Sequence, residues 1–239
     1  MIEIKKGTEP AGLRELRDRA AAMGLSPEEA YNTLRGSLKD GVRDALISEQ
    51  GQLCAYCMCK IPRDNVDADI APIVIEHYVP RNPADGRDTG QGLDYQNLLA
   101  VCNGNRARKG RHRFIDLTCD AHRGNTEFKK VNPCKKETLL SITYTLDGKI
   151  DSSDPDVKYD LENTLNLNCP ASPIPNERKA TLDGLIQYID DLGEISEREL
   201  LSDCKRILNS LTGEINSKTP YVGILIWYLQ TIVDALSGR

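Results

Sequence analysis

Four cysteines restrict the fold of this chain more than any other feature of its sequence. Cys54 and Cys57 form a C-x2-C pair, Cys102 ends a short apolar run, and Cys119 follows further along the chain. Four thiolates can close a tetrahedral site around a structural zinc ion. We therefore expect Cys54, Cys57, Cys102 and Cys119 to bind one zinc ion, which would contribute directly to folding.

A C-x2-C pair can also be a redox-active dithiol. Such a dithiol normally lies at a helix start in a thioredoxin-like βαβ unit, which this sequence does not indicate. Cys59 is a competing thiol, because it extends the pair to C-x2-C-x-C. We expect four cysteines not to be ligands: Cys59, Cys134, Cys169 and Cys204.

Composition indicates a folded chain outside the membrane. The 239 residues are 39% hydrophobic and 28% charged, and no apolar run is long enough to span a bilayer. Residues 1–6 lack the apolar segment of a signal peptide. We expect a cytoplasmic location and no membrane partner. In a reducing compartment, eight cysteines favour metal binding over disulfides.

A carboxylate and a histidine lie between the second and third cysteines of this set. The β-rich run 73–75 leads directly into Glu76 and His77, and Asn97 opens a second short apolar run that could pair with the first. A neutral imidazole near a metal can take a proton from an attacking water molecule. Carboxylate oxygens suit Mg or Mn, so Glu76 and Asp120 are candidate ligands for a catalytic ion.

Positive charge gathers in one segment although the chain carries a net charge of −5. Residues 101–136 hold ten Lys or Arg against three acids, so this segment is +7 and the remainder is −12. This distribution is what a focused phosphate-binding surface would look like, whereas the alternative is a solvated loop. The candidate nucleic-acid-binding residues in it are Arg106, Arg108, Lys109, Arg111 and Arg113.

The order of these motifs resembles a known family. Cys-x2-Cys, Glu-His-x-x-Pro, Asn-Leu-Leu, Cys and Cys-Asp-x-x-Arg-Gly are similar to HNH endonucleases of the ββα-metal type with a zinc knuckle, over residues 52–124. More narrowly, the chain looks like the HNH subunit of Septu-type and retron-linked anti-phage systems. The segments that carry this narrower likeness are Cys-Ala-Tyr-Cys, Ile-Glu-His, Tyr-x-Asn-Leu-Leu, Asn-Gly-Asn after Cys102, Val131-Asn132-Pro133 and Asp147-Gly148-Lys149-Ile150.

The resemblance implies a role for each matched residue. His77 would be the general base, and Asn97 would brace the loop that carries it. Glu76, in the first motif position, would be a ligand of the catalytic metal. The family's partner is a large ATPase, and we expect such a partner here.

The third motif position is less well defined by the resemblance. Asp120 stands where the wider family often has His or Asn, so it would be the second ligand of the catalytic metal, with His122 as the alternative. Arg123 stands where a lysine is common and would hold a phosphate. The insertion between Cys102 and Cys119 is longer than in a simple knuckle.

We expect an α+β chain in three parts. Residues 1–50 are a helical lead-in, residues 51–136 are a small ββα-metal HNH module with a structural zinc, and residues 137–239 are a β-hairpin followed by a mostly helical region. The expected function is metal-dependent hydrolysis of nucleic acid, with DNA favoured over RNA, as the effector of an anti-phage defence complex. The alternatives are a ribonuclease (tRNase) with the same site and a non-catalytic, zinc-containing nucleic-acid-binding module.

The segment 221–236 is the most apolar in the chain. A helix that is apolar on most sides needs burial on several sides. We interpret it as core of the C-terminal region, and the alternative is an interface with the ATPase through Trp227 or Tyr228.

Overall fold

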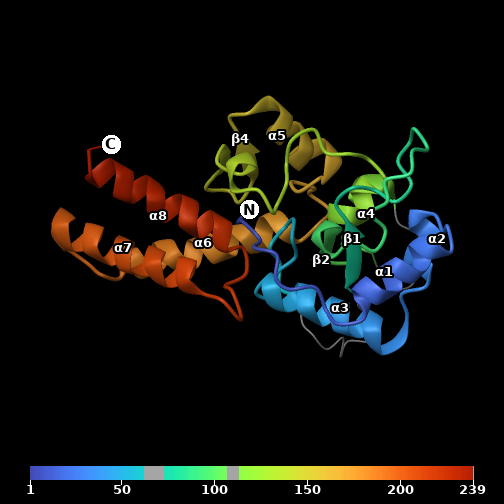
Figure 1. The fold of residues 1–239 in the computed structure, drawn as a ribbon. Coiled ribbons are helices and arrows are strands. Elements are labelled where there is room, and N and C mark those ends of the chain that lie inside the picture. Colours follow the sequence, from blue (N-terminus) through green and yellow to red (C-terminus); the bar gives the residue numbers. More distant parts are fainter. Residues whose placement is uncertain (62–72, 107–112, 239) are drawn as a thin grey trace.

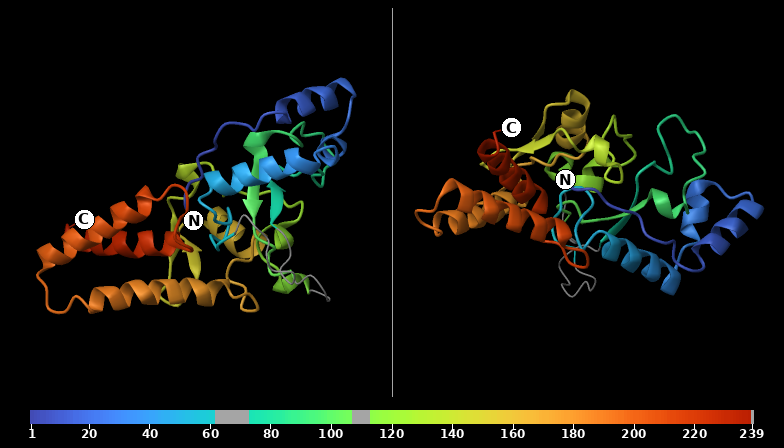
Figure 2. Two further views of the ribbon diagram at one scale, coloured as in Figure 1. Left: turned by 90° about the horizontal axis from the view of Figure 1, so that it is seen from below. Right: turned by 60° about the vertical axis from the view of Figure 1, so that its left-hand side comes forward.

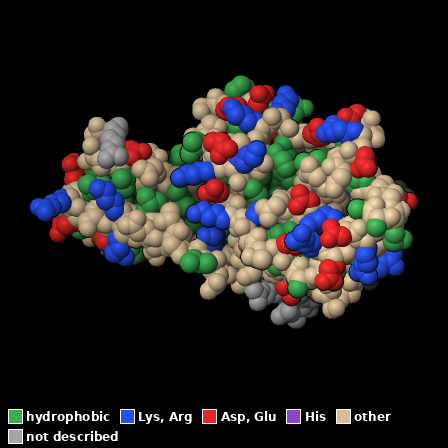
Figure 3. All heavy atoms as spheres, in the orientation of Figure 1, with side chains coloured by type: hydrophobic (Ala, Val, Ile, Leu, Met, Phe, Trp, Pro, Cys, Tyr) green, Lys and Arg blue, Asp and Glu red, His purple; other side chains and the backbone are tan. Residues whose placement is uncertain are grey.

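The computed structural model describes residues 1–61, 73–106 and 113–238. Helices surround two small antiparallel sheets, which is the α+β class expected from the sequence (Figure 1). None of the described helices is long and apolar enough to cross a bilayer. On the face drawn in Figure 3, Lys and Arg side chains are intermixed with Asp and Glu.

Three helices form the N-terminal part. Their bounds are Leu13–Ala22 for α1, Pro27–Asn32 for α2 and Gly36–Glu49 for α3. α2 begins where the sequence directs it, because Ser26 and Glu29 form a capping box and Pro27 occupies the first helical turn. α3 packs against strand β2 through a buried apolar face.

The central hairpin consists of β1 (Val74–His77) and β2 (Leu98–Val101). The strands pair antiparallel with His77 opposite Leu98, and β2 is buried along its whole length. Gln50, at the end of α3, holds β2 through both polar atoms of its side-chain amide. Its Nε2 donates to the Ala100 carbonyl (2.7 Å) and its Oε1 accepts from the Ala100 N–H (2.8 Å). The short helix α4 (Cys119–Arg123) follows in the chain.

A second hairpin, β3 (Ile142–Tyr144) with β4 (Ile150–Ser152), turns at Asp147 and Gly148, as the sequence predicts. Gly148 has φ 84°, and a Cβ there would lie 2.3 Å from the Pro175 carbonyl oxygen, so this turn requires glycine. α5 (Pro155–Tyr159) follows and continues into a π-helical turn over Asp160–Thr164.

Three long helices form an arm that extends from the rest of the molecule (Figures 1 and 2). They are α6 (Ile174–Asp190), α7 (Glu197–Gly213) and α8 (Val222–Leu236), and α8 packs against both others. The first turns of α8 bury Ile224 in the main core, whereas Leu229 joins a second cluster around Cys204 of α7. The core interpretation of this helix therefore describes most of its length, while Trp227 and Tyr228 are half-buried.

The main core includes residues from all three predicted parts of the chain, for example Leu46, Leu98 and Leu182. The boundaries at residues 50 and 136 stay a prediction.

Candidate metal centre and active-site cleft

Cys54, Cys57, Cys102 and Cys119 come together in one group, whose sulfur atoms all lie within 4.8 Å of one another. The Sγ atoms of Cys54 and Cys119 are 4.0 Å apart, those of Cys57 and Cys102 are 3.8 Å apart, and those of Cys102 and Cys119 are 3.7 Å apart. Sulfur ligands about 2.3 Å from a tetrahedral zinc ion would be separated by about 3.8 Å. The four-cysteine group therefore fits a metal such as zinc.

The backbone around the first two cysteines forms a tight knuckle, residues 53–60. The Cys54 N–H donates to the Cys59 carbonyl (2.9 Å), and Met58 takes a left-handed φ of 65° to close the turn. The Ala55 N–H donates to the Ala100 carbonyl (3.1 Å), which fixes the knuckle against β2. Cys59 itself lies outside the four-cysteine group.

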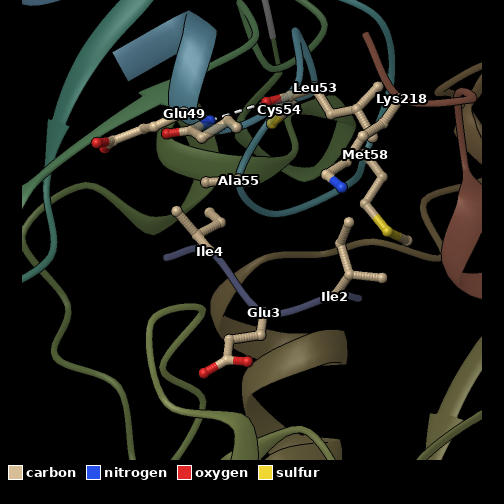
Figure 4. Close-up of a pocket in the computed structure, with 10 residues that line it drawn as sticks. Ile2, Glu3, Ile4, Glu49, Leu53, Cys54, Ala55, Met58 and Lys218 are labelled. Atoms are coloured by element: carbon tan, nitrogen blue, oxygen red, sulfur yellow. Dashed lines mark hydrogen bonds between the residues drawn. The ribbon is translucent and has the colours of Figure 1, made fainter. Parts of the chain in front are cut away.

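The N-terminal segment supports the knuckle from below. Ile2 and Ile4 point toward Ala55 and Met58, whereas Glu3 points away (Figure 4). The space between them is a cavity of about 10 Å³, so the packing leaves room for about one water molecule.

Cys119 places α4 relative to the knuckle. Its φ of 53° is left-handed, a conformation that is costly for a residue with a Cβ and persists only where the surroundings hold it. Here its N–H donates to the Leu165 carbonyl (2.8 Å), and its sulfur belongs to the four-cysteine group. Asp120, the next residue, lines a different site.

That site is a cleft of about 180 Å³ beside the end of β1. The residues of interest that line it are Glu76, His77, Arg81, Arg106, Asp120 and Asn125. The cleft thus joins the two residues at the end of β1 with the first carboxylate of α4.

His77 is 5% exposed, and its Nε2 lies 2.9 Å from the Gly92 carbonyl oxygen. A carbonyl oxygen only accepts, so Nε2 carries the proton and Nδ1 keeps the basic lone pair. Burial lowers the pKa of His77 to about 4, and the positive charges of Arg81 and Arg123 act in the same direction. The imidazole is therefore neutral near pH 7, as a general base must be.

Two residues from outside the motif hold His77 in place. Tyr31 of α2 packs its ring edge-on against the imidazole, with 4.6 Å between ring centroids. Gly92 passes so close to α2 that a Cβ would lie 2.0 Å from the Pro27 carbonyl oxygen. Only glycine lets the chain bring its carbonyl to His77 at this point.

Asn97 clamps the loop that follows His77. Its Oδ1 accepts from the Val79 N–H (2.7 Å), and its Nδ2 donates to the Val79 carbonyl (3.0 Å) and the Gln91 carbonyl (3.3 Å). These are the contacts of a brace, although its effect on catalysis stays a prediction.

Glu76 is buried and bonded to two polar side chains. The Tyr56 hydroxyl donates to its Oε1 (3.1 Å), and the Arg123 guanidinium forms an ion pair with the same oxygen. Burial raises the pKa of Glu76, the nearby Asp120 carboxylate raises it further, and Arg123 opposes both effects. Two neighbouring carboxylates beside a cleft are a donor set suited to a divalent cation such as Mg or Mn.

Arg123 does not face the cleft as an available cation. It is 2% exposed, and its guanidinium donates to the carbonyls of His77 (3.0 Å), Tyr78 (2.6 Å) and Thr126 (2.8 Å) besides pairing with Glu76. Every nitrogen of the Arg123 guanidinium therefore has a protein partner. This arrangement gives no support to the predicted contact between Arg123 and a phosphate.

His122 is directed elsewhere than Asp120. Its ring stacks on Phe114, with 4.3 Å between centroids, and its Nδ1 lies 3.2 Å from the Thr164 carbonyl oxygen. Among the described residues that line the cleft, Asp120 is the side chain contributed by α4. Of the two candidates for the third motif position, the geometry favours Asp120.

The five candidate nucleic-acid-binding residues of the basic segment 101–136 fall into three groups. Arg106 lines the cleft and is exposed. Arg113 forms an ion pair with Asp116 (2.7 Å). Arg108, Lys109 and Arg111 lie outside the described residues.

Sequence reasoning missed three residues of the site: Tyr31, Arg81 and Gly92. The sequence did contain a signal for Arg81, because this charged residue directly follows Glu-His-x-x-Pro. Tyr31 and Gly92 had none, because their roles depend on where α2 packs.

Comparison with known proteins gives one informative match and no matching family model. Over 107 residues the chain is 28% identical to a curated protein of Escherichia coli, whose name describes a proposed HNH endonuclease of retron Ec83. The match covers 44% of this chain and 40% of that relative's length, so the two share less than half of either protein. The similarity supports a nuclease in broad terms.

Proposed function

We propose that this protein is a metal-dependent HNH endonuclease that hydrolyses phosphodiester bonds of DNA. The observation that carries the proposal is the cleft, where the neutral His77 and the carboxylates of Glu76 and Asp120 converge. The distant HNH-named relative supports it independently. In this proposal, β1, β2 and α4 are the ββα-metal module.

The two metal sites have different tasks. The four-cysteine group would bind a structural zinc ion, because four thiolates leave no position open for a substrate. Glu76 and Asp120 would hold Mg or Mn in the cleft, with water and phosphate oxygens as the remaining ligands. When bound, this ion stabilises negative charge on the phosphate and leaving oxygens.

His77 supplies the proton acceptor. Its Nδ1 takes a proton from the attacking water, while the Nε2–H bond to the Gly92 carbonyl fixes the ring. Asn97 holds the loop behind it, and Arg123 holds Glu76 on the same side of the cleft. These residues orient the reacting groups without contributing a further proton transfer.

We further propose that the nuclease is the effector of an anti-phage defence complex with an ATPase partner. The word retron in the relative's name and the Septu-like motifs support this extension. The exposed and half-buried residues of α8, among them Trp227 and Tyr228, are the surface we assign to that partner.

The test is a cleavage assay with the purified protein. Single-stranded DNA, duplex DNA and RNA are each incubated with Mg or Mn, with and without a co-expressed ATPase. Cleavage of DNA that stops on removal of the divalent ion supports the proposal. Cleavage of RNA alone would make the protein a ribonuclease, and tight binding without cleavage under every condition would make it a binding module.

A further inference from the structure

Arg81 differs from Arg87 and Arg123. It follows β1 by four residues, lines the cleft, and stacks its guanidinium on the ring of Tyr31, with 4.5 Å from its Cζ to the ring centroid. Arg87 and Arg123 both form ion pairs with carboxylates. Within the described part of the chain, Arg81 has no such pair.

Tyr31 contacts both Arg81 and His77. One face of its ring carries the guanidinium, and its edge-on packing reaches the imidazole. Burial raises the pKa of Tyr31, and the positive charge of Arg81 opposes that rise. A single aromatic side chain of α2 thus fixes a cation relative to the proposed base.

We propose that Arg81 binds a non-bridging oxygen of the phosphodiester in the cleft and that Tyr31 positions its guanidinium relative to His77. This inference rests on the proposed function and names the phosphate-binding residue of that site. It reassigns to Arg81 the role that the motif gives to Arg123.

The chemistry favours arginine in this position. A guanidinium held over an aromatic ring can still donate its N–H groups, and its planar fork matches two phosphate oxygens. Glu76 and Asp120 alone would repel a phosphodiester, so a cation in the same cleft lowers the cost of bringing substrate and metal together. Arg106 supplies charge at the exposed rim of the same cleft.

Lys39 provides a matched control. Its Nζ lies 5.4 Å from the centroid of the same Tyr31 ring, but it is not among the cleft-lining residues. Arg87, in the loop between β1 and β2, is a second control because it pairs with Asp85 and Glu127.

The experiment measures binding and cleavage separately. Binding of a fluorescent DNA oligonucleotide is followed by anisotropy without divalent metal over a range of salt concentrations. Arg81→Ala should weaken binding and reduce the slope of log affinity against log salt by about one, as expected for one lost phosphate contact. Lys39→Ala and Arg87→Ala should leave the slope unchanged.

Cleavage tests the role in the reaction. Arg81→Ala should lower the cleavage rate about ten- to a hundredfold, the range for one lost charge-assisted hydrogen bond. Arg81→Lys should recover part of the loss, and added guanidinium ion should partly rescue Arg81→Ala. Tyr31→Leu should lower the rate, and the two changes together should cost less than the product of their separate effects.

The outcomes are distinguishable. If wild-type protein cuts DNA and Arg81→Ala matches it in slope and rate, the inference is overturned while the proposed function stands. If wild-type protein binds but never cuts, the proposed function fails, and the salt slope of Arg81→Ala still decides whether this residue contacts phosphate. Lost binding in Arg81→Ala without rescue by lysine or guanidinium would indicate a structural role and would also overturn it.

Discussion

The guanidinium of Arg123 forms a buried ion pair with the carboxylate of Glu76, and this contact joins α4 to the strand that ends in His77. The same guanidinium spans the backbone carbonyls of His77 and Tyr78. One side chain of α4 thereby sets the position of the proposed base and of its neighbouring carboxylate.

Replacing Arg123 should therefore lower the stability of the fold more than it affects the binding of DNA phosphates. Arg123→Ala leaves Glu76 buried without its partner, and we expect a loss of about 3–5 kcal/mol in the free energy of unfolding, measured by urea denaturation. Arg113→Ala, which removes an exposed pair, should change it little. If Arg123→Ala kept its stability and lost DNA affinity alone, Arg123 would be a phosphate ligand after all.

Removal of a ligand from the four-cysteine group should release metal. Cys57→Ala opens a closed four-ligand site, so we expect a sharp loss of stability and of bound zinc, measured as metal content per chain. Cys134→Ala is the control, because this half-buried thiol lies outside the group. Wild-type protein should hold about one zinc ion per chain in that group. A fully folded, metal-free preparation would contradict the assignment.

His77→Ala should abolish cleavage while the fold and the zinc content remain. A positioned acid–base group contributes at least about a hundredfold, which single-turnover assays can resolve. His122→Ala offers a matched comparison, since His122 stacks on Phe114 and is not among the residues that line the cleft. Near wild-type turnover by the His77 variant would end the HNH assignment.

Gly92→Ala should disturb the site through the backbone that bonds to His77. The new Cβ would meet the Pro27 carbonyl oxygen, so α2 or the loop must shift, at a cost of about 1–3 kcal/mol. The carbonyl that holds His77 shifts with it, and we expect slower cleavage in the same variant. Gly41→Ala, in open space on α3, should be neutral or stabilising by up to about 1 kcal/mol in thermal unfolding.

Leu229 of α8 tests whether this helix is core. It is fully buried between α8 and α7, so Leu229→Ala should cost about 2–5 kcal/mol in chemical denaturation. Trp227→Ala is the companion variant. Loss of a co-purifying ATPase with little loss of stability in that variant would support the interface reading of this surface.

Local pattern predicts part of this molecule well. The β-rich run before Glu76 and the apolar run after Asn97 do pair as an antiparallel hairpin, in which β2 is buried along its whole length. The four cysteines converge as expected, and the C-x2-C spacing of Cys54 and Cys57 is the local signal for this site.

Burial of charge and long-range packing limit the rest. The sequence places an arginine at position 123 but does not show whether its charge is free or buried. Only the fold shows that Glu76 and three carbonyls enclose it. Likewise, the helical lead-in carries no motif, yet Tyr31 of α2 contacts the proposed base. Contacts between segments far apart in the chain have no local periodicity to reveal them.

Cys119 and Asp120 are adjacent in the chain but serve two different sites. α4 is only five residues long and is held at its first residue by the four-cysteine group. A newly made chain without metal would therefore lack a fixed place for Asp120 opposite Glu76. Under the proposed function, zinc supply would then determine how many copies can cut nucleic acid, and a chelator strong enough to strip zinc would stop cleavage even with magnesium in excess.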